Sequence, residues 1–232
     1  MALAGTLLLA TVLASGVYIF VAPLLEDLVA RNLQSRLGLD SVPEISLEGG
    51  PTSLLTGRFD GGRAVLPGFD FGDVHPDEIS VELAPFDLDV LGSLTSGQLQ
   101  TRIPLSGTLR AMLSEAEVTR VASTGATDFP VRNVDLEEGV TVVTSETFAL
   151  GQSIPVSVEG VLDLQNNSLV FEPRRVEALG LPVPDQLTGQ LLQGTSFVYP
   201  IEPLPGGGTF TGVHVQRDQL VLTGEINNLA LL

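Results

Sequence analysis

The chain has 232 residues, of which 44% are hydrophobic and 17% are charged, and its formal net charge is −17. The hydrophobic fraction is too high for a disordered acidic tail, and the acidic balance excludes the basic surface that nucleic acid binding requires. The sequence contains neither Cys nor Lys. Disulfides, thiolate metal sites and lysine-dependent chemistry are therefore excluded.

The first part of the chain has the composition of a membrane segment. Residues 2–25 contain no charged side chain, and about 20 apolar residues suffice to cross the hydrocarbon core. Ala14-Ser15-Gly16 is a possible signal peptidase site, but the apolar run continues beyond it. We therefore expect residues 1–23 to form an uncleaved transmembrane anchor, with a cleaved signal segment as the alternative. Export is the favoured orientation, which places the main domain on the extracytoplasmic side of the plasma membrane.

An amphipathic helix is predicted directly after Pro23. Its apolar positions follow the i, i+3, i+4 rule at Leu25, Leu28, Val29, Leu33 and Leu37. Pro23 suits the first turn of a helix, and Gly38 suits its C-terminal end. We expect the apolar face to cover a sheet, and a lipid can share the same face.

After Gly38 the apolar residues alternate with polar ones, which predicts antiparallel strands with one buried face. The alternating rows comprise Ile79, Val81 and Leu83; Ile154, Val156, Val158, Leu162 and Leu164; and Leu220, Leu222 and Ile226. Tight turns are predicted at Glu138-Gly139, Asn166-Asn167 and Arg217-Asp218. Short helices are predicted over residues 51–56, over residues 114–123, where Ser114 and Glu117 have capping-box spacing, and over residues 184–194.

These elements predict an α+β fold. We expect a long curved antiparallel β-sheet wrapped around, or packed on, the N-terminal amphipathic helix together with the short helices. Residues 1–23 form the anchor or signal segment and residues 24–232 form a single domain. A one-faced sheet rolled about a helix can leave an apolar groove in place of a closed core.

No catalytic, metal or cofactor site is expected. The two histidines, His75 and His214, have no partner at ligand spacing, and the acidic loop over residues 70–78 lacks the EF-hand order. A carboxylate-dependent hydrolase using Asp87, Asp89 or Glu137 is the weakest hypothesis, because no spacing selects a pair of these carboxylates.

The sequence resembles the LmeA-type phospholipid-binding family of actinobacterial cell-envelope proteins. The resemblance rests on the stretches LEGGPTSLLTGRFDGGRAVLPGFDFG, PRRVEALGLPVPDQL and SFVYPIEPLPGGGTFTGVHVQRDQLVLTG. It implies phospholipid binding on the outer side of the membrane, a role in envelope glycolipid or mannan maturation, and a layout like that of the tubular lipid-binding folds. It supplies no catalytic residues.

The function expected is that of a membrane-anchored extracytoplasmic phospholipid-binding or lipid-transfer protein. The alternative is an anchored structural module that recruits an enzyme of envelope assembly. The candidate residues for an apolar lipid groove are Leu25, Leu28, Val29, Leu33, Ile79, Val81, Leu83, Ile154, Val156, Val158, Phe171, Leu191, Leu192 and Phe197. Arg174 and Arg175 are the headgroup candidates, because a guanidinium can hold a phosphate through paired hydrogen bonds. Adjacent strand residues point to opposite faces, so at most one of the two is expected to face the groove, and pairing with Glu172 and Glu177 is the alternative.

Overall fold

A computed structural model describes residues 21–35, 37–124, 130–149, 152–183, 197–202, 204 and 207–229. Most of the predicted anchor and the predicted helix over residues 184–194, with Leu191 and Leu192, lie outside these residues. Among the residues described, no helix has the length and apolar character needed to cross a bilayer.

The N-terminal helix includes residues 21–35, so Pro23 lies inside it. Leu25, Val29 and Leu33 are buried on one face, as the spacing predicted. Gly38 follows the helical residues with a φ of 66°, a left-handed conformation that glycine adopts without strain and that commonly ends a helix. The predicted amphipathic helix and its end are confirmed.

The first sheet has six strands in the order β1-β3-β4-β6-β14-β13, and every neighbouring pair is antiparallel. The strands are β1 (Glu44–Glu48), β3 (Gly61–Leu66), β4 (Glu78–Leu83), β6 (Leu105–Ser114), β13 (Gly208–Gln216) and β14 (Gln219–Leu229). The predicted rows in β4 and β14 lie side by side across β6, because Ile79 and Leu222 both pair with Ala111.

The second sheet is built on the order β11-β10-β9-β8-β7, with β12 also paired to β10. Its strands are β7 (Val131–Glu137), β8 (Val140–Ala149), β9 (Gln152–Gln165), β10 (Ser168–Ala178), β11 (Leu181–Pro182) and β12 (Phe197–Pro200). The hairpin between β9 and β10 turns at Asn166 and Asn167, with φ of 50° and 59°. Two consecutive positive φ values are typical of a type I′ turn, so the predicted turn is confirmed.

The prediction of one continuous sheet is wrong, because the structure divides the strands between two main sheets. Helix α4 (Glu115–Thr124) follows β6 and interrupts the succession of strands, and β7 then begins the second sheet. Strand twist accumulates across a sheet, so large open sheets tend to split or curl. The two sheets meet where Gly139 donates a backbone hydrogen bond to Val215 at 3.0 Å and Asp218 donates one to Leu136 at 3.0 Å.

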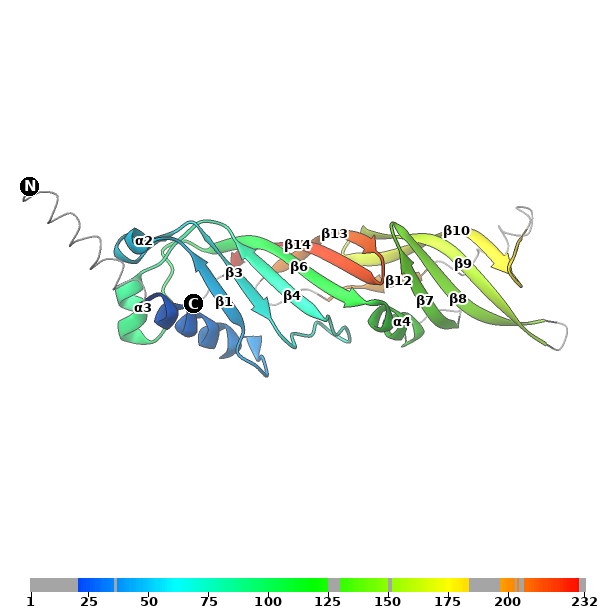
Figure 1. Ribbon diagram of the computed structural model, residues 1–232, viewed down its shortest axis with the longest axis horizontal. Helices are drawn as coiled ribbons and strands as arrows, with labels where there is room; N and C mark the ends of the chain where they lie inside the picture. The colour runs from blue at the N-terminus through cyan, green and yellow to red at the C-terminus, as the bar shows by residue number, and fades with distance from the viewer. Residues whose placement is uncertain are drawn as a thin grey trace, which may run out of the picture.

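The molecule is elongated, with the two sheets following one another along its long axis (Figure 1). One hydrophobic core runs through both sheets, from Leu39 beside the first sheet to Phe171 and Val176 in the second. The coarse prediction of an α+β fold with an N-terminal helix and antiparallel sheets is confirmed.

One end of the molecule has its own hydrophobic core. There the N-terminal helix meets α2 (Pro51–Thr56), α3 (Val90–Ser96) and a small sheet of β2 (Arg58–Phe59) and β5 (Phe86–Asp87) (Figure 1). Leu25, Leu54 and Val90 belong to this second cluster, and the rings of Phe59 and Phe86 stack with centroids 5.2 Å apart. Helix α2 confirms the short helix predicted over residues 51–56.

Candidate functional site

An apolar cavity lies between the N-terminal helix and the first sheet. Among the residues that the structure describes, those that line it are all aliphatic or aromatic: Val29, Leu33, Leu37, Ile45, Ala64, Leu66, Phe69, Ile79, Val81, Leu83, Leu105, Leu109, Leu204 and Ile226. We call this the first cavity. Because the described part of its wall offers no hydrogen-bonding side chain, it suits a hydrocarbon ligand and not a polar one.

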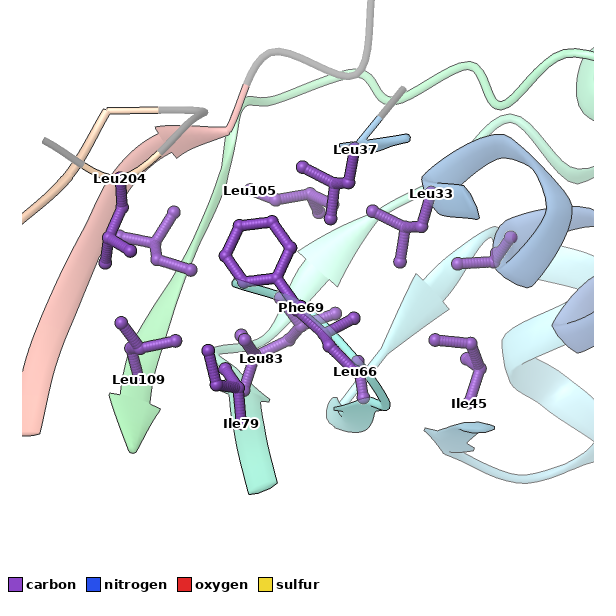
Figure 2. A pocket seen from close by; sticks show the side chains of 14 residues that line it. Leu33, Leu37, Ile45, Leu66, Phe69, Ile79, Leu83, Leu105, Leu109 and Leu204 are labelled. Carbon is purple, nitrogen blue, oxygen red and sulfur yellow. The ribbon is translucent and has the colours of Figure 1, made fainter. Parts of the chain in front are cut away.

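The first cavity is smaller than an ordinary ligand pocket. Its volume is about 60 Å³, whereas pockets for small ligands measure about 300–1,000 Å³. The ring of Phe69 projects into the middle of the group, between Leu204, Leu105 and Leu66 (Figure 2). The enclosed part is therefore narrowed by a single large side chain.

The structure brings together part of the predicted groove. Val29, Leu33, Ile79, Val81 and Leu83 all line the first cavity. The other candidates on the N-terminal helix lie beside it in the second core cluster, where Leu25 is fully buried and Leu28 is partly buried. The candidates in the second sheet are Ile154, which is half-buried, and Val156, Val158 and Phe171, which are buried in the main core. A role for any of these residues in binding lipid stays a prediction.

A second cavity lies farther along the core, where the two sheets meet. Its lining is also apolar except for one tyrosine: Phe71, Val74, Leu113, Val118, Val121, Ala122, Leu169, Phe197, Tyr199, Ile201, Leu220 and Leu222. Its volume is about 30 Å³. Among the candidates, Phe197 lies here. The sequence did not predict this cavity, because its wall combines α4 with segments from both sheets.

The two cavities follow one another along the same strands. On β6, Leu105 and Leu109 line the first cavity and Leu113 lines the second. At about 3.3 Å per residue, the path from Leu105 to Leu113 is roughly 26 Å long. One leaflet of a bilayer contributes about half of the 30 Å hydrocarbon core. The depth that acyl chains occupy in one leaflet is thus shorter than the combined path.

Two phenylalanines stand between the cavities. Phe210 pairs with Gly224, which lies on β14 between Leu222 of the second cavity and Ile226 of the first. Its ring packs on Phe71 with centroids 5.4 Å apart. Since Phe71 lines the second cavity, this aromatic pair forms part of the partition between the two spaces.

Polar groups gather beside the second cavity. The Arg120 guanidinium donates to the Glu117 carboxylate, at 2.8 and 2.6 Å, and to the carbonyl oxygen of Asp73. The pKa of Tyr199 is raised, first by burial and then by the negative charge of Asp73. The Tyr199 hydroxyl therefore keeps its proton and is available as a hydrogen-bond donor at the edge of an apolar space. Sequence reasoning missed this residue, which has no motif around it.

Glu117 has a different role from the predicted capping box. Helix α4 does begin directly after Ser114, but the Glu117 carboxylate accepts a hydrogen bond from the backbone N–H of His75 at 2.7 Å, in the loop between β3 and β4. This contact ties the loop that carries Phe69 and Phe71 to α4. Hydrogen bonding by Arg120 is the largest cause of a pKa for Glu117 below its ordinary value.

We expect acidification to loosen this loop through Glu117. A carboxylate whose pKa is lowered by folding contributes stability above its unfolded pKa of about 4.3, and this stability is lost as pH falls through the lower folded value. Glu117→Gln should cost about 1–3 kcal/mol at neutral pH and flatten the fall in stability below about pH 4. Urea unfolding of both proteins between neutral and acidic pH checks this. Parallel pH profiles of the wild type and the variant would contradict it.

Arg174 and Arg175, the headgroup candidates, are both exposed. The pairing of β10 with β9 shifts register between Pro173 and Arg175, and a β-bulge of this kind disrupts the strict alternation of faces. Arg175 forms an ion pair with Glu177 at 3.1 Å, the alternative that the sequence suggested. Neither arginine is among the residues that line the two cavities, and their role at a headgroup stays a prediction.

Of the three carboxylates named for the hydrolase hypothesis, two have structural partners and the third lies apart from them. Asp89 accepts a hydrogen bond from the backbone N–H of Gly92 at 3.0 Å at the start of α3, and Asp87 forms a long ion pair with Arg58 at 3.7 Å. Glu137 is exposed at the end of β7 in the other sheet. Within the described part of the chain, no group of three or more His, Cys, Asp or Glu side chains is placed to hold a metal ion.

An elongated antiparallel fold with an apolar cavity under a helix is the architecture expected of proteins that hold a hydrocarbon group. The chain matches the model of the LmeA-like phospholipid-binding family over residues 19–225, and it belongs to that family. Membership implies lipid binding, and the family is not a known enzyme family. No match was found among the curated proteins or among the solved structures.

Proposed function

We propose that this protein is a membrane-anchored extracytoplasmic protein that binds a phospholipid and acts, as a binding or transfer protein, in cell-envelope lipid or glycolipid maturation. The observation that carries the proposal is the first cavity, where every lining residue that the structure describes is apolar. Residues 2–20, which are free of charged side chains, supply the anchor. The family match supports the phospholipid as ligand.

Binding requires the first cavity to widen. The enclosed space is smaller than an acyl chain, and the Phe69 ring occupies its centre (Figure 2). Phe69 lies in the loop after β3, outside the ladder of the strands, and rotation of its ring away from Leu105 and Leu204 would admit a chain. The loop between β3 and β4 is thus the proposed entrance.

The free energy of burying an acyl chain bears on affinity but not on selectivity. Burying an acyl chain from water is worth about 0.8 kcal/mol per CH₂, or roughly 12 kcal/mol for a 16-carbon chain. A lipid drawn from a bilayer leaves an apolar phase, so the exchange itself gains little. The apolar wall therefore provides tolerance for different chains, and headgroup selectivity must come from polar groups outside it, with Tyr199 and Arg120 beside the second cavity as candidates.

The test is native mass spectrometry of the full chain, purified in mild detergent from the membranes of an exporting bacterial host. We expect protein peaks that carry the mass of one phospholipid.

The same cells report on which side of the membrane the domain lies. The chain has no Cys, so a single Leu181→Cys should react in intact cells with a maleimide that cannot cross the membrane. Lipid-free protein that also takes up no phospholipid from vesicles would reject the binding proposal. A Cys that stays unreactive in intact cells but reacts once the cells are opened would reject the location.

One observation favours the alternative of an anchored interaction module. Leu179 and Leu181 are 66% and 69% exposed, and Val198 on β12 is 64% exposed. The two leucines lie beside the last residues of β10, at the end of the molecule far from the N-terminal helix (Figure 1). Exposed apolar groups of this kind are typical of protein contacts. If the module hypothesis is correct, crosslinking from position 181 in cells will recover one dominant protein partner, and the purified protein will carry no lipid.

A further inference from the structure

The end of the molecule that carries the N-terminal helix exposes several large apolar side chains. Leu24 is 60% exposed, Leu55 is 79%, Leu91 is 76% and Leu94 is 38%. We call these four residues the apolar tip. They come from the N-terminal helix, α2 and α3, which lie together at one end of the molecule (Figure 1).

The apolar tip is held in place by the second core cluster. Each of its most exposed residues directly neighbours a buried member of that cluster: Leu24 precedes Leu25, Leu55 follows Leu54, and Leu91 follows Val90. The buried residues anchor their elements, and the exposed leucines project outward from a supported surface. The exposure is therefore a feature of the packed fold and not of a loose loop.

The tip has no charge on its two short helices. Neither α2 (PTSLLT) nor α3 (VLGSLTS) contains an ionisable side chain, in a chain whose net charge is −17. A strongly acidic protein is repelled by anionic headgroups, so it can approach a bilayer closely only through an uncharged surface. Exposed leucines on such a surface are suited to the boundary between headgroups and acyl chains.

The residues that precede the described structure join the chain at this same end of the molecule. Residues 2–20 carry no charged side chain and continue directly into the N-terminal helix, ending four positions before Leu24. We infer that the apolar tip is a membrane-docking surface that inserts its leucines into the acyl region of a lipid bilayer. Val29, Leu33 and Leu105 belong both to the cluster beneath the tip and to the lining of the first cavity. Docking thus places the first cavity next to the bilayer through continuous apolar contacts.

The sequence supplies a clean probe, because the chain contains no Trp. Full-length Leu55→Trp and Leu91→Trp proteins each carry one indole, at positions exposed enough to accept it. They are reconstituted into phosphatidylcholine vesicles whose acyl chains carry bromine, which quenches an indole only at close range. We expect their emission to fall about twofold or more relative to vesicles without bromine. Leu181→Trp, which is equally exposed but lies at the opposite end, is the matched control and should keep its emission.

A second measurement follows lipid uptake. The double variant Leu55→Ser, Leu91→Ser should take up phospholipid from phosphatidylcholine vesicles about tenfold more slowly than the wild type, since it loses most of the inserted apolar area. The double variant Leu179→Ser, Leu181→Ser should match the wild type. Both pairs are on the surface, so folding is preserved.

The outcomes separate this inference from the proposed function. Quenching at positions 55 and 91 without any lipid uptake by the wild type would leave the docking surface in place and reject lipid binding. Indoles that stay unquenched, as at position 181, would overturn the docking surface even if the cavity binds lipid. A blue-shifted but unquenched indole would show that protein covers the tip, which also overturns the inference.

Discussion

Replacing Ala64 with Phe is expected to weaken phospholipid binding by tenfold or more, about 1.4 kcal/mol at the least. Ala64 is 4% exposed and lines the first cavity, and its strand partners Ile45 and Val81 line it as well. An added ring at this position occupies the space that an acyl chain needs. Native mass spectrometry and vesicle-uptake assays on the full chain measure the loss. Overpacking costs typically about 1–3 kcal/mol, so the unfolding free energy must be measured in parallel.

Val65→Phe is the matched control for this variant. Val65 is the next residue on β3, so its side chain points to the opposite face, where it is only partly buried. We expect this protein to retain lipid. A second comparison, Ala122→Phe, fills the second cavity alone and shows whether the two spaces act together. An Ala64→Phe protein that carries lipid as the wild type does would mean that the first cavity is not the binding site.

Replacing Phe210 with Ala is expected to cost about 3–5 kcal/mol of stability and to lengthen the acyl chains that the protein retains. Phe210 is 5% exposed and packs on Phe71 at the partition between the two cavities. Removing its ring leaves a void that joins the two spaces. The chain-length distribution of co-purified phospholipid, read by mass spectrometry, should shift toward longer chains, and urea unfolding of lipid-free protein gives the stability loss.

Phe86→Ala controls for the loss of a buried ring. Phe86 is 6% exposed, stacks on Phe59, and lines neither cavity. We expect a stability loss of similar size with an unchanged distribution of chain lengths. If both variants retain the same lipids, the Phe71–Phe210 pair does not limit chain length and the cavities are independent.

The sequence predicted strands, turns and helix faces where these depend on residues close together in the chain. The alternation from Ile154 to Leu164 predicted a one-faced strand, because successive side chains of a strand point to opposite faces. Asn166-Asn167 predicted a tight turn, and both residues do adopt positive φ. The helical spacing after Pro23 likewise placed Val29 and Leu33 on the face that now lines the first cavity. These features depend on covalent geometry within a few residues.

Register and sheet boundaries were not readable in the same way. The bulge around Arg174 leaves both arginines on the surface, although simple alternation predicted that one can face inward. The division into two sheets depends on where α4 interrupts the strands and on accumulated twist. Both outcomes depend on partner strands that are distant in sequence.

The sequence by itself determined that this chain has an amphipathic helix, one-faced strands with defined turns, an acidic surface without lysine and no recognisable catalytic motif. Tertiary structure alone decided that an apolar space remains inside. The wall of the first cavity draws Leu33, Phe69, Leu109 and Leu204 from four separate segments, and its volume is the small difference between the space those segments enclose and the space their side chains fill. A difference of this kind arises only when the whole chain is packed.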